Sequence, residues 1–368
     1  MKTGLSLTEL AEKLDRIRNA KADFIVDTRA LEIIHAETGD AKRMLVQMKN
    51  GGETFDIEPH ALRQMEARAK IPAKYADRLL EHHPDLLAYN LNELFKREPE
   101  KRMLRTIDNN VRAFLSDGYR IMDNFDLAEA VLPTLVQVGA EVISCEVTER
   151  RMYIKAIRPD MRADFGPPPG AQMGVGHTFF IEHVQAGITI SNSEIGSGRL
   201  SIQPSVFTDR CTNWCSFDNS SYAKVHLGAR AGGDDESMIW QVMSDATKRK
   251  ADDALWSQVH DVAVAAMDGT IFDAIVERLR QARGDLIAGD PVKVVERVSN
   301  HLALTDDESG GVLNFLIQGG DLSRYGVHAA LTRTASEDVL DYDRATQLEQ
   351  YGAQIIDLPT ADWQRLAA

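Results

Sequence analysis

The sequence has few cysteines and no long apolar run. Cys145, Cys211 and Cys215 are the three cysteines among its 368 residues, too few and too odd a number for the disulfide framework of a small secreted domain. No stretch approaches the roughly 18 consecutive apolar residues of a membrane-spanning helix, and the charged, amphipathic residues 1–24 lack the apolar centre of a signal peptide. We therefore expect a cytoplasmic protein with no membrane partner.

An excess of positive charge is also missing. The chain has 42 Lys and Arg against 56 Asp and Glu, a net charge of -14, whereas nucleic-acid affinity comes largely from cations that neutralise phosphates. The acidity is C-terminal, because residues 231–368 hold 12 basic and 24 acidic residues while residues 91–230 hold 16 and 17. The basic residues of this middle region cluster at 96–105 and 150–162. The clusters are compatible with a local cationic groove and equally with ordinary solvated faces.

What is present is enough apolar material for a large core. With 43% hydrophobic residues, a chain of this length buries a sizeable interior. The apolar periodicities predict an α+β fold, in which helices back a central antiparallel sheet and the C-terminal region is helical and acidic. We expect a mixed N-terminal region with a helical cluster at 1–100, a sheet core with a cationic strand and hairpin at 101–230, and the acidic helical region at 231–368.

Short sequence signals predict where the helices, strands and loops lie. Pro59, Pro72 and Pro84 predict helix starts, and Glu141–Val147 with Met152–Ile157 predict a hairpin. Residues rich in Gly and Pro predict a loop at 159–176. The other predicted elements are helices over 5–20, 125–138, 234–283, 291–303, 311–318, 321–334 and 336–353, and strands over 23–26, 43–48, 54–57, 111–115, 179–184, 187–191 and 200–207.

The most informative stretch is 102–120, where strand-like apolar positions alternate with arginines and a tyrosine lies at a turn. The residues concerned are Arg102, Arg105, Arg112, Tyr119 and Arg120. A guanidinium can hold a phosphate with two hydrogen bonds, and a base can stack on a tyrosine ring. The ordinary alternative is a core tyrosine beside a β-turn, with Arg120 paired to Asp117 or Asp123.

Three later segments extend this cationic pattern. Arg151 and Lys155 lie on one face of the second hairpin strand, and the polar turn Ser191–Arg199 has two glycines whose backbone N–H groups can form an anion nest. Such turns more often satisfy only their own backbone, and a tryptophan such as Trp214 is usually buried. The predicted nucleic-acid contacts are Arg102, Arg105, Arg112, Tyr119, Arg120, Arg151, Lys155, Arg199, Arg210 and Trp214.

The histidines and cysteines keep a metal-dependent enzyme as an alternative function. His177 and His183 fall on one face of a strand, and Glu194 or Asp209 can complete a metal set only if the fold brings it close. This arrangement keeps a metal-dependent nuclease or phosphodiesterase as an alternative function, so whether the protein is an enzyme stays open.

The cysteine pair is the weaker part of that alternative. Cys211, Cys215 and His226 are zinc-type ligands by residue type, or a nucleophile with its base. The commoner outcome for such cysteines is burial as small apolar side chains. We predict neither a metal site nor a cofactor.

Four segments together resemble a known family. They are 102–120, Asn192–Gly196, Arg210–Asn213 and Tyr325–Arg333, and they span roughly residues 20 to 360. The sequence resembles the phage/plasmid-like proteins grouped as domain of unknown function nine-three-two. The family has no settled activity, so the resemblance implies a mobile genetic element as the setting and marks these segments as the ones of interest.

The function predicted from these observations is binding of single-stranded nucleic acid, with strand annealing in recombination or replication by a homo-oligomer as one form of it. Single-stranded DNA is the expected partner. The alternatives are the metal-dependent nuclease and a protein-interaction module. In the latter, acidic residues of 234–253 and 337–343 imitate DNA toward a host protein, as in an anti-defence factor.

Overall fold

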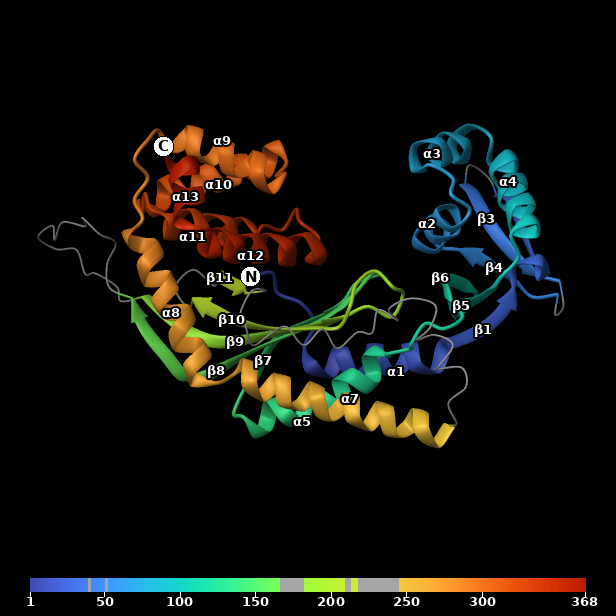
Figure 1. The fold of residues 1–368 in the computed structure, drawn as a ribbon, viewed down its shortest axis with the longest axis horizontal. Helices are drawn as coiled ribbons and strands as arrows, with labels where there is room; N and C mark the ends of the chain where they lie inside the picture. The colour runs from blue at the N-terminus through green and yellow to red at the C-terminus, as the bar shows by residue number, and fades with distance from the viewer. Residues whose placement is uncertain (39–40, 50–51, 166–181, 209–212, 218–244) are drawn as a thin grey trace, which may run out of the picture.

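The computed structural model describes residues 1–38, 41–49, 52–165, 182–208, 213–217 and 245–368, and it confirms the predicted α+β class. In place of one central sheet, the described chain forms two, each packed against helices (Figure 1).

The N-terminal sheet has six strands in the order β1–β5–β6–β4–β3–β2, antiparallel except for the parallel pair β4 and β6. The strands are β1 (Lys21–Asp27), β2 (Leu31–Thr38), β3 (Ala41–Met48), β4 (Thr54–Ile57), β5 (Lys101–Ile107) and β6 (Asn110–Ser116). The predicted boundary at residue 100 divides this sheet, because β5 and β6 complete it.

Helices α2 (Pro59–Arg68), α3 (Ala73–His82) and α4 (Pro84–Arg97) pack on this sheet, and the short 3-10 helix η1 (Thr28–Ala30) joins β1 to β2. Pro59 and Pro84 occupy first turns and Pro72 is the N-cap of α3. The proline signals therefore predicted these starts correctly, since the missing N–H costs nothing where no intrahelical partner exists.

The second sheet is antiparallel throughout, in the order β11–β10–β9–β8–β7. Its strands are β7 (Glu141–Val147), β8 (Met152–Phe165), β9 (Glu182–Asn192), β10 (Ser201–Thr208) and β11 (Asn213–Ser216). The β7–β8 hairpin confirms the prediction for 141–157.

Two predictions fail in this sheet. The loop expected at 159–176 is wrong for 159–165, which continue β8; residues 166–176 lie outside the described residues. The register shifts between Arg158 and Arg162, so Pro159 lies in a bulge, where its missing N–H interrupts no ladder. In the same way β9 continues through Gln185 and Ala186, which the predicted strands 179–184 and 187–191 left out. A Cβ on Gly187 would lie 2.7 Å from the Trp214 ring, so this glycine permits close packing of the ring on the strand.

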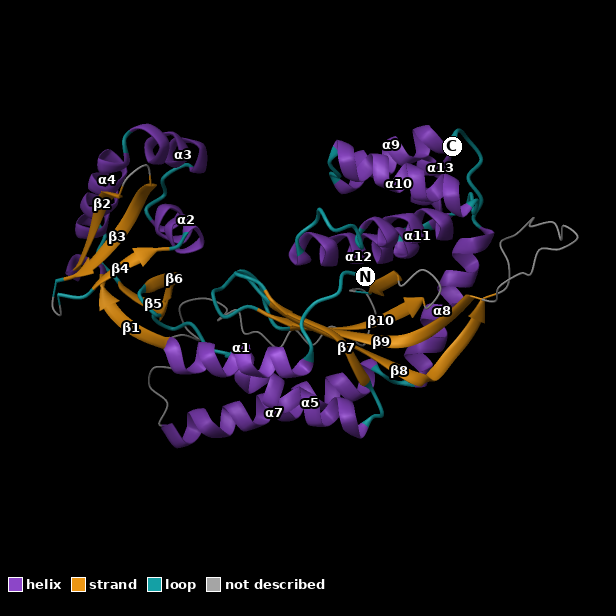
Figure 2. Ribbon diagram, turned by 180° about the vertical axis from the view of Figure 1, so that it is seen from behind, coloured by secondary structure: helices purple, strands orange, loops and turns teal. Residues whose placement is uncertain are grey.

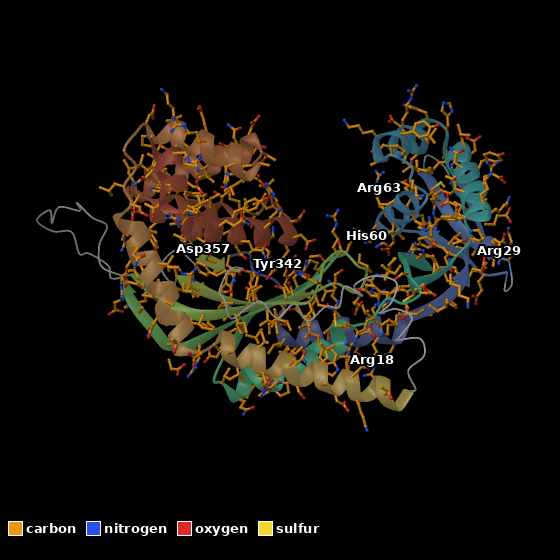
Figure 3. The ribbon with its side chains drawn as sticks, viewed as in Figure 1. Arg18, Arg29, His60, Arg63, Tyr342 and Asp357 are labelled. Carbon is orange, nitrogen blue, oxygen red and sulfur yellow. The ribbon has the colours of Figure 1, made fainter. Side chains whose placement is uncertain are left out.

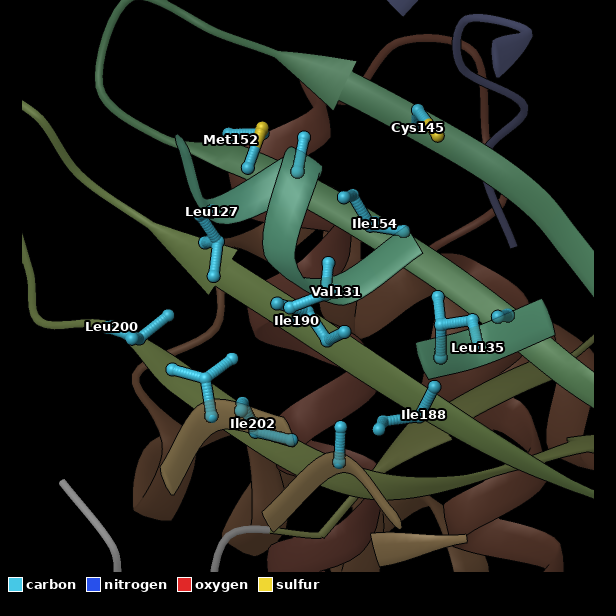
Figure 4. Close-up of a cluster of buried hydrophobic side chains, with 14 of the residues drawn as sticks. Leu127, Val131, Leu135, Cys145, Met152, Ile154, Ile188, Ile190, Leu200 and Ile202 are labelled. Atoms are coloured by element: carbon cyan, nitrogen blue, oxygen red, sulfur yellow. The ribbon is translucent and has the colours of Figure 1, made fainter. Parts of the chain in front are cut away.

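The two faces of the second sheet differ. Met152, Ile154 and Ala156 alternate with Tyr153 and Lys155 along β8. The apolar face packs against α1 (Leu7–Ala20), α5 (Asn124–Gln137) and α7 (Asp245–Ala266) and forms an extended buried cluster (Figure 4). The opposite face is polar and lies beneath the C-terminal helices.

The helix predicted over 234–283 is two helices in the described part, α7 and α8 (Gly269–Gly284). The Asp268 side chain accepts a hydrogen bond from the N–H of Thr270 and caps α8, which is why the helical pattern restarts there. The predicted short helices are confirmed as α9 (Pro291–Leu302), α10 (Asp306–Gly319), α11 (Arg324–Thr334) and α12 (Tyr342–Asp357), and an unpredicted α13 (Thr360–Ala367) follows.

The molecule has the shape of a U (Figures 1 and 2). The second sheet with α1, α5 and α7 forms the floor, the six-stranded sheet with α2–α4 forms one arm, and α9–α13 form the other. None of the helices in the described part of the chain has the length and apolar character that crossing a bilayer requires.

Candidate functional site: a polar groove at the hairpin end of the second sheet

A groove of about 630 Å³ lies between the turn that joins β7 to β8 and the first half of α12. The sheet side contributes the turn Thr148–Arg151, Tyr153, Ser191 and Ser197. The helix side contributes Asp341, Asp343, Arg344, Thr346, Gln347 and Gln350. Its volume falls within the roughly 300–1,000 Å³ of small-molecule sites. We call it the hairpin groove.

The groove lies at the inner base of the C-terminal arm. Figure 1 shows the hairpin end of the second sheet between the two arms. Figure 3 shows Tyr342, at the start of α12, on one side of this space and His60 and Arg63 of α2 on the other. The hairpin end of the second sheet, which supplies the Thr148–Arg151 side of the groove, therefore lies between the two arms.

The turn itself is fixed by its threonine. The N–H of Thr148 donates to the carbonyl of Arg151 at 2.8 Å. The Thr148 hydroxyl accepts from the N–H groups of Arg150 and Arg151 at 3.1 and 3.0 Å. A hydroxyl that holds both N–H groups fixes the backbone at this corner, so two successive arginines start from a rigid platform.

Arg150 and Arg151 of the turn line the groove, and the backbone of Arg199 adjoins Arg151. Arg151 donates to the Ser191 hydroxyl at 2.9 Å and to the carbonyl of Arg199 at 3.0 Å, which connects the β7–β8 turn to the turn after β9. Arg150 and Arg199 are exposed, and neither forms an ion pair with any residue in the described ranges. Neither guanidinium group is therefore occupied by a carboxylate of the described residues.

The α12 side of the groove adds little attraction for an anion. Asp343 accepts from the hydroxyls of Tyr153 and Thr148 at 2.8 and 3.2 Å. Arg344 donates through two nitrogens to Glu308, at 2.6 Å each, and this contact lowers the pKa of the Glu308 carboxyl. Because its charge is already paired, Arg344 adds little attraction for an anion, and the cationic part of the groove is its sheet side.

The arginines of the predicted cationic strand are engaged internally. Arg105 is 4% exposed and donates to Asp23 at 2.9 Å, Asp123 at 2.7 Å and the carbonyl of Glu194 at 2.8 Å. These partners raise its pKa despite the opposing effect of burial. Arg105 thus joins β1, α5 and the turn after β9, and its role as a phosphate contact is corrected to a structural one.

Arg112, Arg120 and Arg102 also have acidic partners. Arg112 donates to Glu194 at 3.3 Å, Arg120 to Asp252 at 2.8 Å, and Arg102 pairs with Glu100. Arg120 was expected either to hold phosphate or to pair with Asp117 or Asp123, and its aspartate comes instead from α7. These three guanidinium groups are part of the internal ion-pair network, so a phosphate would have to compete with a carboxylate.

Tyr119 packs against Met103, Leu115 and Ile195 and donates to the carbonyl of Ser193 at 3.3 Å. Burial raises the pKa of its hydroxyl. The ring is half-buried in the junction between the two sheets, the arrangement anticipated by the alternative of a core tyrosine.

The turn after β9 connects the two halves of the molecule. Its Glu194 accepts from Arg112 of β6 and, at 2.7 Å, from the N–H of Asn124 at the start of α5. The carbonyl of Ile195 accepts from Gln64 of α2 at 2.8 Å and lies 3.0 Å from Nε2 of His60. The Asn192–Gly196 segment and the 102–120 segment therefore meet in one junction, although no anion nest is needed to explain it.

Lys155 and Trp214 are corrected from ligand contacts to core residues. Both side chains are 0% exposed. Lys155 pairs with Glu349 of α12 at 2.5 Å, and the Trp214 indole donates to Thr189 at 2.8 Å and to Ser216 at 3.0 Å. Burial lowers the pKa of Lys155 and Glu349 opposes that effect. Neither residue can touch a strand of nucleic acid at the surface.

The described candidates for metal binding do not come together. His183 contacts Asp164 at 2.7 Å, Glu194 is held in the junction, and Cys215 is buried with its pKa raised. Within the described ranges no group of three or more His, Cys, Asp or Glu side chains is placed to hold a metal ion. Arg210, Cys211, His177, Asp209 and His226 lie outside the described residues.

The acidic segments proposed to imitate DNA are described only in part. Residues 234–244 lie outside the described residues. In 337–343, Asp341 caps α12 and Asp343 contacts Tyr153, so two of these carboxylates serve local structure.

Sequence reasoning left out the α12 side of the groove. Asp343, Gln347 and Gln350 recur at helical spacing, and that amide-rich face was the available signal. Arg150, adjacent to Arg151 in the predicted turn, is the other omitted residue.

The comparisons with known proteins add no assignment. A scan against protein-family models, a search of the curated proteins and a search of the solved structures each gave no match to this chain.

Proposed function

We propose that the protein binds single-stranded nucleic acid and that the arginines at the mouth of the hairpin groove hold its phosphates. The observation that supports this is the pair Arg150 and Arg151 on the sheet side of a polar groove, next to Arg199, whose carbonyl accepts from Arg151. Arg150 and Arg199 are exposed and form no ion pair within the described ranges. Guanidinium groups bind phosphate with paired hydrogen bonds.

The rest of the groove favours a single strand over a duplex. Its lining offers hydroxyl, amide and carboxylate groups, which are partners for base edges, and base edges are accessible in single strands. We place this activity in replication or recombination of a mobile genetic element, following the resemblance to phage/plasmid-like proteins, with strand annealing by a homo-oligomer as its specific form.

The acidic character of the protein sets the expected salt dependence. With a net charge of -14, long-range attraction is weak and affinity depends on few contacts. Three phosphate contacts on a single strand give a slope of about -2 for log K against log salt, since each contributes about -0.7.

The test is fluorescence anisotropy of labelled single- and double-stranded oligonucleotides across a salt series, with and without divalent metal, followed by a gel of the recovered DNA. We expect tighter binding of single strands, a slope of about -2 and intact DNA in every lane. Absence of binding at about 50 mM salt, or a preference for duplex, contradicts the proposal. Cleavage that needs metal would instead assign the protein to the nuclease alternative.

A further inference from the structure

The two sides of the hairpin groove differ in chemistry, and the difference orients a bound strand. Asp343, Gln347 and Gln350 of α12 line the groove at spacings of four and three residues, so they share one helix face. None is basic. The N-terminus of α12 offers no place for an anion, because Asp341 already caps it and accepts from the N–H of Arg344 at 2.7 Å. Phosphates therefore belong on the sheet side.

Thr346 gives the helix side an unused polar group. It lines the groove, is 2% exposed, and its Oγ1 has no hydrogen-bond partner among the residues that the structure describes. A buried hydroxyl without a partner costs on the order of 1–3 kcal/mol. A polar ligand atom that reached Thr346 would remove that cost.

Two glutamines beside Thr346 have hydrogen-bonding capacity left. The carbonyl oxygen of Gln347 accepts from Arg344 at 2.5 Å, so its NH₂ group remains a donor. The NH₂ group of Gln350 donates to Gln203 at 3.2 Å, so its carbonyl oxygen remains an acceptor. One turn of α12 thus presents a donor, an acceptor and a hydroxyl, and every nucleobase edge presents donors and acceptors side by side.

We propose that the hairpin groove holds one unstacked nucleotide of the bound strand, with its base contacting Thr346, Gln347 and Gln350 while Arg150 and Arg199 hold the flanking phosphates. This inference rests on the proposed single-strand binding, and it adds selectivity for the base that the groove holds. The groove volume of about 630 Å³ accommodates a nucleotide, and Asp341 and Asp343 repel a phosphate placed on the helix side.

The experiment compares short oligonucleotides of the four homopolymers with an abasic strand of the same length, which keeps the phosphates and removes the bases. Wild type should bind its preferred homopolymer about tenfold more tightly than the abasic strand. T346V should weaken binding of the preferred homopolymer about fivefold, the loss of one hydrogen bond, and leave the abasic strand unchanged. T334V is the matched control, because Thr334 is a buried helical threonine that bonds to the carbonyl of Ala330 away from the groove.

T346V should fold as wild type does, because it replaces an unpartnered buried hydroxyl with a methyl group of similar shape, and a thermal melt checks this. Equal affinity of wild type for the abasic strand and all homopolymers overturns the nucleotide site and leaves the proposed single-strand binding intact. So does a T346V effect that is the same for both kinds of strand. No binding of any strand by wild type overturns the proposed function and this inference together.

Discussion

His328 of α11 is enclosed by its surroundings. Its ring lies 5.5 Å from the Tyr325 ring, and its Nδ1 lies 3.1 Å from the carbonyl of Gly352 in α12. Burial lowers the pKa of His328 to about 4 from its ordinary 6.5, and the hydrogen bond to Gly352 only partly opposes this. The folded protein therefore keeps this ring neutral at pH values where the unfolded chain protonates it.

The consequence is a loss of stability in mild acid. Between about pH 6.5 and 4 the unfolded state binds a proton that the folded state does not, so the free energy of unfolding falls as pH falls through this window. For His328 alone we expect a loss of about 2 kcal/mol from pH 7.5 to pH 5. Urea unfolding of wild type and H328N at both pH values measures it. A pH effect equally large in H328N would assign the loss to other groups.

Arg105 and Arg150 are both arginines in cationic segments, yet their replacement is expected to change the free energy of unfolding by very different amounts. R105A leaves the buried carboxylate of Asp123 and the more accessible one of Asp23 without this cation, and we expect a loss of about 3 kcal/mol in the free energy of unfolding. R150A removes an exposed side chain and should change stability by less than about 0.5 kcal/mol. Chemical denaturation of the two variants measures both changes in the free energy of unfolding. Similar values for both would show that Arg105 is not a junction residue.

At the scale of elements, α12 is held to the second sheet by a buried ion pair. Lys155 of β8 and Glu349 of α12 are both 0% exposed, and the Lys155 ammonium also lies 4.9 Å from the Tyr342 ring centre. Two ions so deeply buried repay their desolvation only as a pair. This contact sets the position of the helix that forms one side of the hairpin groove.

Replacing only one partner of the Lys155–Glu349 pair should therefore destabilise the protein more than replacing both partners with apolar residues. K155M leaves a buried carboxylate without its lysine and is expected to lose about 3–5 kcal/mol, whereas the double variant K155M/E349L should recover most of this. Equilibrium unfolding of K155M, E349L and the double variant in denaturant gives the three losses of free energy. If the double variant is as unstable as the sum of the two single variants, the ion pair is not the feature that matters at this interface.

The elements show how far the sequence predicts this fold. Prolines at helix starts and alternating apolar residues placed α2, α4, β7 and the β7–β8 hairpin, because these signals act within a few residues. Pro159 misled the prediction. A bulge accommodates the proline, and that bulge depends on a neighbouring strand that local sequence does not name.

The candidate site was less predictable for the same reason. Arg105, Arg112 and Arg120 have the residue chemistry of phosphate ligands, but their carboxylate partners come from β1, α5, α7 and the turn after β9. Pairing across such separations follows from the tertiary fold alone. Arg151 was predicted and lines the groove, and the predicted Arg199 adjoins Arg151 through its carbonyl, whereas the α12 side of the groove was not predicted.

At the scale of the whole molecule, the U shape places the cationic end of the floor between two arms (Figure 1). The junction at Asn192–Gly196 links the N-terminal arm to the floor through hydrogen bonds to α2, β6 and α5. A strand bound at Arg150 and Arg199 would therefore lie where both arms can border it.

The most direct test of this account is the salt dependence of single-strand binding by R150A/R199A. We expect the slope of log K against log salt to fall from about -2 to about -0.7, with affinity reduced about tenfold or more at low salt. The control R78A/R162A removes the same charge from exposed positions on α3 and the far part of β8, and it should keep the wild-type slope. An unchanged slope in R150A/R199A, or an equal loss in the control, would contradict phosphate binding at the hairpin groove.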